Sequence, residues 1–158
     1  MKIILKTIVA VICIVGLSSS PALSAQPKMP DKKDRCPVCG MFVAPYPDWI
    51  TTIVQKDDSQ IFFDGCKDLF RYYFALPVGP GQGSRDDIAA IYVTEYYSTQ
   101  LMPVDEVFFV LGSDVYGPMG KELIPVANKE LAESFMRDHS GTQILPFEKI
   151  TLEILPAN

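Results

Sequence analysis

The chain has 158 residues, a formal net charge of −5 and 48% hydrophobic residues. This length suits one compact unit or two very small ones, and the apolar content is sufficient for a real core. The acidic balance argues against nucleic acid and against an anionic membrane as partners. Four cysteines are fewer than a disulfide-dense scaffold of this size would carry.

The N-terminal segment has the order of a secretory signal peptide. A short start with two lysines precedes an apolar run at residues 8–17, which is too short for a membrane helix of roughly 20 residues. Small residues follow, and cleavage after Ser24 fits the pattern best. Cys13 lacks the small preceding residue of a lipoprotein signal, so we expect it to be removed. We predict a signal peptide at 1–24 and a soluble mature protein at 25–158, periplasmic or otherwise exported.

The first half of the mature chain predicts a strand pair followed by a helix. Residues 49–55 are rich in β-branched side chains, and residues 60–63 form the expected antiparallel partner. Asp64 is the expected N-cap of a helix at 66–76, where apolar residues recur every three or four positions.

A stretch rich in proline and glycine, residues 77–87, is the expected boundary between sub-units at about 35–76 and 88–155. The second half predicts further elements: strands at 88–97, 106–111, 123–126 and 147–155, a glycine-rich loop at 112–120, and a helix from its N-cap Asn128 to His139, ended by Gly141. Strands and helices without regular βαβ alternation indicate an α+β fold.

The two halves of the chain have similar local patterns. A strand that ends at Phe63 leads to a helix that contains Lys67, Asp68 and Leu69. A later strand at 123–125 leads to a helix that contains the triplet 129–131, Lys-Glu-Leu. The pattern suggests a duplicated ββαβ unit. Any strand–helix pair of similar length would align about as well, so the duplication is a hypothesis.

Cys36 and Cys39 form a C-x-x-C pair, which can bind one metal ion or close a small disulfide ring. A structural zinc site would need Cys66 and His139 as well, and neither has the tight spacing that such sites use. A thioredoxin-type pair opens a helix, whereas Gly40 and two prolines follow here. A short-loop disulfide is the competing interpretation in an oxidising compartment.

Met41 lies two residues after Cys39, so in an extended segment the two side chains project to the same side. Thiolate and thioether sulfurs select soft ions, Cu(I) above all. Core packing is the commonest role of a methionine, but the adjacent cysteines favour a metal site here. We predict that Cys39 and Met41 are the primary Cu(I) ligands and that Cys36 is a third or alternate ligand.

Three further residues are candidates for completing the site. Met119 lies in the glycine-rich loop and has no packing partner by periodicity. His139 is expected at the end of the second helix, where capping the last carbonyls is the ordinary role of a histidine. Cys66 lies at the start of the first helix, where the helix dipole favours a thiolate, although nearby Asp64 opposes a second negative charge.

Four blocks of the sequence resemble the NosL family: residues 36–43 (CPVCGMFV), 46–49 (YPDW), 62–68 (FFDGCKD) and 112–125 (GSDVYGPMGKELIP). The resemblance implies an exported Cu(I)-binding accessory protein, not an enzyme, that serves maturation of nitrous oxide reductase in denitrification. It also implies two small ββαβ-type units related to the organomercurial lyase fold. The family's Cys-x-Met falls on Cys39 and Met41, and Met119 and His139 are candidates for its further ligands.

The resemblance implies an apo-cuproenzyme as the client, nitrous oxide reductase or a similar enzyme, with membrane copper-assembly machinery as a further partner. The chain departs from many members because it lacks a lipoprotein cysteine and because it carries Cys66 where a small or apolar residue is expected. Two other functions stay open. One is a periplasmic thiol–disulfide protein that cycles Cys36 and Cys39, and the other is an organomercurial-lyase-like enzyme that uses Cys66 and Cys39.

Overall fold

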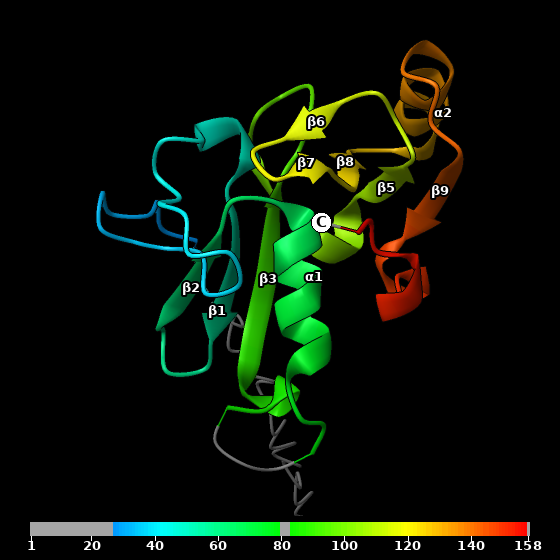
Figure 1. The fold of residues 1–158 in the computed structure, drawn as a ribbon. Coiled ribbons are helices and arrows are strands. Elements are labelled where there is room, and N and C mark those ends of the chain that lie inside the picture. Colours follow the sequence, from blue (N-terminus) through cyan, green and yellow to red (C-terminus); the bar gives the residue numbers. More distant parts are fainter. Residues whose placement is uncertain (1–26, 80–82, 158) are drawn as a thin grey trace, which may run out of the picture.

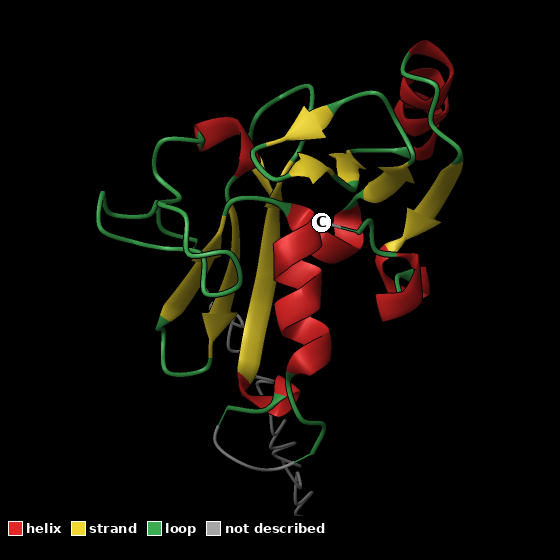
Figure 2. Cartoon of the chain, viewed as in Figure 1, coloured by secondary structure: helices red, strands yellow, loops and turns green. Residues whose placement is uncertain are grey.

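The computed structural model of the chain describes residues 27–79 and 83–157. The predicted signal peptide at 1–24 lies outside these residues. The described part is a mixed α and β structure in which two helices pack against antiparallel sheets (Figures 1 and 2). The predicted α+β class is therefore confirmed. No helix in the described part of the chain has the length and apolar character that a membrane span requires.

The larger sheet has four antiparallel strands in the order β2-β1-β3-β4. Their bounds are Thr51–Gln55 for β1, Gln60–Phe63 for β2, Ile88–Thr94 for β3 and Leu101–Pro103 for β4. Thr51 lies opposite Phe63, so the hairpin predicted from the β-branched run is confirmed. The central strand β1 is buried over its first four residues, as expected of a strand with a neighbour on each side.

Helix α1, Cys66–Ala75, packs along the larger sheet (Figure 1). The helix is predicted correctly, but its N-cap is not Asp64. Gly65 takes the cap position without a side-chain bond, and the buried Glu122 accepts a hydrogen bond of 2.8 Å from the backbone N–H of Lys67. The first turn is thus capped by a residue from a distant part of the chain, which leaves the Asp64 carboxylate free to face a different segment.

The smaller sheet has the order β8-β5-β9, with helix α2 packed against it. The bounds are Phe108–Leu111 for β5, Ile124–Val126 for β8, Lys129–Asp138 for α2 and Gln143–Pro146 for β9. The predicted N-cap of α2 is confirmed, since the Asn128 side chain accepts the N–H of Leu131 at 2.9 Å. A two-stranded hairpin, β6 (Tyr116–Gly117) and β7 (Gly120–Lys121), occupies part of the predicted glycine-rich loop.

The C-terminal segment differs from its prediction. The last strand is β9, and the region predicted as a strand contains the short 3₁₀ turns Phe147–Lys149 and Leu152–Ile154. Phe147 turns inward there because its ring packs on Phe70, with 6.0 Å between ring centroids. The end of α2 also differs from the prediction that Gly141 ends this helix. Ser140 has the left-handed backbone conformation there (φ 55°), and the N–H of the next residue, Gly141, donates to the Met136 carbonyl.

The two sheets share one connectivity. In each, an inner strand comes first, an edge strand beside it follows, and the chain passes through a helix to the strand on the other side of the first; in the larger sheet that strand, β3, also pairs with β4. The duplication itself remains a hypothesis. The expected boundary at 77–87 falls between α1 and β3, hence inside the unit of the larger sheet. Both sheets contribute to one apolar core, in which the Phe70 ring on α1 meets the Phe109 ring on β5 at 5.2 Å.

Candidate metal centre

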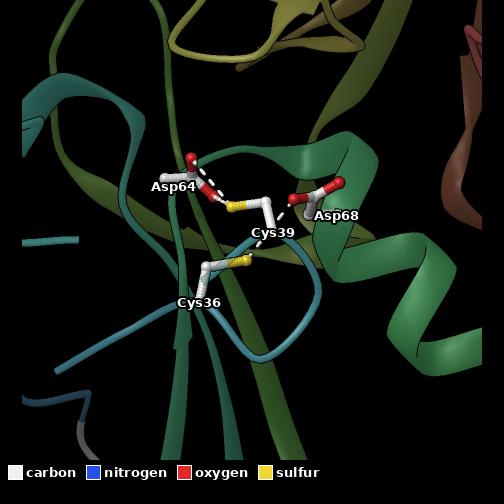
Figure 3. Close-up of side chains that lie close together, drawn as sticks. All are labelled: Cys36, Cys39, Asp64 and Asp68. Atoms are coloured by element: carbon white, nitrogen blue, oxygen red, sulfur yellow. Dashed lines mark hydrogen bonds between the residues drawn. The ribbon is translucent and has the colours of Figure 1, made fainter. Parts of the chain in front are cut away.

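Cys36 and Cys39 lie in a tight loop that precedes β1. The Cys36 N–H donates to the Met41 carbonyl and the Gly40 N–H donates to the Cys36 carbonyl, each at 2.9 Å. Gly40 has φ +80°, a conformation that glycine adopts without strain. An isolated antiparallel bridge between Arg35 and Phe42 closes the base of the loop. These bonds fold the C-x-x-C segment back on itself, so that both cysteines face the start of α1 (Figure 3).

Two carboxylates complete a compact group with these thiols. The candidate ligand atoms of Cys36, Cys39, Asp64 and Asp68 all lie within 4.8 Å of one another. Cys39 Sγ donates to Asp64 Oδ1 at 3.3 Å, and Cys36 Sγ donates to Asp68 Oδ2 at 3.4 Å (Figure 3). Asp64 and Asp68 are 1% and 2% exposed; Asp64 lies just before α1, Asp68 lies in its first turn, and both face the loop. We refer to these four residues as the thiol–carboxylate cluster.

Burial governs the protonation of the two thiols. It raises the pKa of the Cys36 thiol far above its ordinary value, and hydrogen bonds with Asp64 and Cys39 add to this effect. Burial is also the largest cause that raises the pKa of Cys39, with smaller contributions from Asp64 and Asp68. Both sulfurs therefore carry protons at neutral pH, in agreement with their donating to carboxylates. A metal ion that binds them has to displace these protons.

Cys39 also borders an open hollow of about 390 Å³. Met41 lines the same hollow, together with Arg35, Gly40, Phe42, Pro45 and Tyr46. Cys36 is 1% exposed and lies behind Cys39, away from solvent. The structure therefore brings Cys39 and Met41 to one accessible surface and places Cys36 in the interior, so that an ion entering from the hollow meets Cys39 and Met41 before Cys36.

Met119 is held near the same end of α1. It lies in the turn between β6 and β7, and its carbonyl accepts a hydrogen bond of 2.7 Å from the ammonium of Lys67. Lys67 is fully buried and directly precedes Asp68 in the first turn of α1. The tertiary fold thus brings the glycine-rich loop to the helix end that carries the thiol–carboxylate cluster.

His139 lies elsewhere. Its Nδ1 pairs with Asp114 Oδ1 at 3.1 Å, and its ring stacks on Phe135 at 4.4 Å between centroids. Phe135 belongs to the core beneath α2, not to the core around the cysteines. The histidine ends α2 and packs there, which is the ordinary role for a residue in that position, and the structure does not bring it to the cluster.

Cys66 is also separate from the cluster. It lines another cavity, of about 280 Å³, with Trp49 and Tyr96 among the residues around it. Its thiol is buried, and burial raises its pKa well above the ordinary value, with the charge of Glu122 adding to the effect. Burial thus disfavours a thiolate at Cys66, because loss of solvation outweighs the helix dipole. The structure does not bring Cys66 or His139 to the C-x-x-C pair, so it gives no support to the zinc alternative.

Asp64 and Asp68 are the cluster residues that the sequence analysis missed as site residues. The signal was present, since two carboxylates four residues apart bracket the start of a helix in the FFDGCKD block. The role that the sequence predicts for Asp64 is capping, because a carboxylate before a helix usually caps it. The deciding contact, with a loop some thirty residues earlier in the chain, comes from the tertiary packing.

Comparisons with known proteins place the chain in a family. The NosL family model matches residues 27–155. Among solved structures, the chain is similar to the copper chaperone NosL from Shewanella denitrificans, with a TM-score of 0.69 and 21% identity over 82% of this chain and 98% of that one. It is also similar to the apo-NosL protein from Achromobacter cycloclastes, with a TM-score of 0.47 and 23% identity over 66% of this chain and 87% of that one. No curated protein matches the sequence. With the family model covering nearly all of the described residues and the Shewanella protein sharing its fold, this chain belongs to the NosL family.

Proposed function

We propose that this protein binds one Cu(I) ion and delivers it to another protein, without catalytic turnover of its own. The observation that carries the proposal is the position of Cys39. Its thiol borders the open hollow together with Met41 and reaches back into the thiol–carboxylate cluster with Cys36. Membership of the NosL family supports the proposal, as does the similarity to a Shewanella protein that is described as a copper chaperone.

The donor atoms favour a soft ion. Cys39, Met41 and Cys36 offer two thiolate sulfurs and one thioether sulfur, a combination that suits Cu(I) better than Zn²⁺. Carboxylate oxygens are harder ligands, and here Asp64 and Asp68 already accept hydrogen bonds from the two thiols. We assign these carboxylates the role of accepting the thiol protons and passing them on to solvent when copper arrives. Met119 is the candidate for a further sulfur ligand, because its loop lies at the same end of α1.

Delivery follows from the open side of the site. A recipient's ligand can approach copper through the hollow, next to Cys39 and Met41, while buried Cys36 keeps its hold from behind. Copper can then pass by stepwise exchange of sulfur ligands, so that the ion is never released as a free cation. A site closed on every side would bind copper as firmly but would transfer it more slowly.

We propose further that the protein is exported through the signal peptide at 1–24, and that its client is a periplasmic cuproenzyme. Nitrous oxide reductase is the client that the family resemblance indicates, with membrane copper-assembly machinery as a further partner. The test is the copper content and activity of nitrous oxide reductase purified from cells with and without this protein. If nitrous oxide reductase from cells that lack this protein were fully loaded with copper, it would be excluded as the client.

The thiol–disulfide alternative has weaker support. Cys36 and Cys39 are near enough to react, but thiol–disulfide exchange depends on an accessible thiolate. Burial raises the pKa of both thiols, and Cys36 is 1% exposed. Both features disfavour attack on a partner's disulfide. They also protect the reduced pair for metal binding. A C-x-x-C pair that readily oxidised and took up no metal would reverse this assignment.

Anaerobic titration of the reduced protein with Cu(I), against a competing chelator of known affinity, tests the proposed function. We expect one tightly bound Cu(I) per chain. Because two thiol protons are displaced, the affinity should rise by roughly a hundredfold per pH unit between about pH 6 and 8, where both thiols are protonated in the free protein. A tenfold slope would show that a single thiol binds copper. Absence of tight binding over this range would end the proposal.

A further inference from the structure

We propose that the loop around the metal centre is a docking surface for a protein whose own surface is acidic, with an apolar centre next to its copper ligands. The surface consists of Lys32, Lys33, Arg35, Val38 and Phe42, and we call it the docking rim. The inference rests on the proposed copper delivery and adds to it the chemical character of the recipient. Its basis is the exposure, rigidity and charge of residues that are not themselves metal ligands.

Apolar side chains are exposed directly beside the proposed exit for copper. Val38 is 39% exposed and Phe42 is 42% exposed, and they flank the Cys39–Met41 segment in the chain. Phe42 also lines the hollow that Cys39 borders. An exposed apolar side chain at the mouth of a site remains in contact with water until a partner covers it, and removing it from water then favours binding. A recipient that covers these two side chains would bring its own ligands to Cys39.

Two residues of the docking rim, Arg35 and Phe42, are held against each other. Arg35 donates a hydrogen bond of 2.7 Å to the Gly40 carbonyl, and its guanidinium lies over the Phe42 ring at 3.6 Å from the centroid. The backbone bridge between Arg35 and Phe42 fixes the same two residues. Phe42 is therefore presented to solvent on a rigid support. A preorganised surface loses little conformational entropy when it binds, which favours its use as an interface.

The charge of the rim is opposite to that of the remaining protein. Residues 28–35 carry four basic and two acidic side chains, whereas residues 36–157 carry eight basic and seventeen acidic side chains. Lys32 and Lys33 occupy the centre of a turn that is closed by a hydrogen bond of 3.0 Å from the Asp34 N–H to the Asp31 carbonyl. This turn continues the ribbon that carries Arg35, since the Val43 N–H bonds to the Asp34 carbonyl.

A basic patch on an acidic protein orients an approaching acidic surface and accelerates its association. A protein is favoured over an anionic lipid surface as the occupant, because Arg35 and Phe42 of the rim line the hollow that Cys39 and Met41 border. A lipid surface has no soft ligand that could take copper from these sulfurs. The recipient should therefore carry acidic residues around an apolar patch that contains a methionine or cysteine ligand.

Copper transfer to synthetic acceptors tests the inference. Two fluorescent peptides share one methionine-rich Cu(I) sequence with adjacent leucines and differ only in flanking aspartates or lysines. The copper-loaded protein should transfer to the aspartate peptide about tenfold faster than to the lysine peptide at low salt, and the difference should shrink at high salt. Replacing the leucines of the aspartate peptide with serine should slow transfer several-fold.

Two double variants change the net charge equally. Lys32→Glu/Lys33→Glu reverses the charge of the docking rim, and the control, Lys129→Glu/Lys149→Glu, reverses two lysines outside it. The first should abolish the preference for the aspartate peptide while Cu(I) affinity stays that of the wild type, and the second should retain the preference. Equal losses in both variants, or no preference in the wild type, would overturn the inference. So would rim-dependent binding to vesicles of phosphatidylcholine and phosphatidylserine with no preference between peptides. If the wild type bound no copper, the proposed function would fail instead.

Discussion

Replacing Cys39 with alanine is expected to weaken Cu(I) binding by at least about a hundredfold, and replacing Met41 by about tenfold. Losing a residue that only orients a metal ligand typically costs 10- to 100-fold in affinity, so losing a thiolate ligand should cost no less. A thioether is a weaker donor than a thiolate, which explains the smaller effect for Met41. Cys39→Ala also removes the one cluster thiol that borders the hollow.

The chain offers controls for both substitutions. Cys66→Ala removes a buried thiol that lines a separate cavity, and Met29→Ala removes a methionine that is 63% exposed in the lead-in to the cysteine loop. Both should leave Cu(I) affinity unchanged, and so should His139→Ala, since that ring is paired with Asp114. Competition titrations of folded, reduced variants give the affinities. Wild-type binding by both Cys39→Ala and Met41→Ala would refute the site.

Glu122→Gln is expected to change how stability depends on pH. Burial raises the pKa of Glu122 to about 8, from its usual value near 4.5. Between these values the folded chain holds a proton that the unfolded chain has lost, so this carboxyl lowers the free energy of unfolding as the pH rises from about 4.5 to about 8. The loss between about pH 5 and pH 8 should amount to about 3 kcal/mol.

The glutamine variant should lack this loss, because its amide stays neutral and can still accept the Lys67 N–H that Glu122 caps. It should therefore be more stable than the wild type near pH 8 and similar to it near pH 5. Glu130→Gln, an exposed change on α2, is the control for removing one negative charge. Urea unfolding at several pH values measures the difference. Parallel stability curves for wild type and Glu122→Gln would show that Glu122 does not titrate in this range.

Glu122 also supports the metal centre, through its contacts with the start of α1. The carboxyl of Glu122 is packed so closely against Gly65 that an added Cβ there would collide with it, and it caps the turn of α1 that carries Asp68. Lys67, next in the chain to Asp68, binds the Met119 carbonyl. The segment between β7 and β8, which carries Glu122, therefore helps to fix the carboxylate side of the thiol–carboxylate cluster, although it contributes none of the four cluster residues.

Local sequence patterns were sufficient for several parts of the fold. The β1–β2 hairpin, both helices and the Asn128 cap are encoded by neighbouring residues, through alternation, helical periodicity and capping chemistry. The predicted strand at 147–155 is wrong because Phe147 and Ile150 join the core from a segment of 3₁₀ turns, as in the contact of Phe147 with Phe70. An apolar run specifies burial, and the backbone conformation that achieves it depends on the neighbouring elements.

The sequence by itself determined the family, the α+β class and the C-x-x-C-x-M segment, because each depends on residues close together in the chain. Only the tertiary structure decided which distant groups join that segment. Packing of the loop on α1 brought in Asp64 and Asp68, kept Cys66 in a separate cavity and left His139 at the far end of α2. The physical reason is that burial and charge at a site are set by contacts between elements, and these contacts leave little trace in local periodicity.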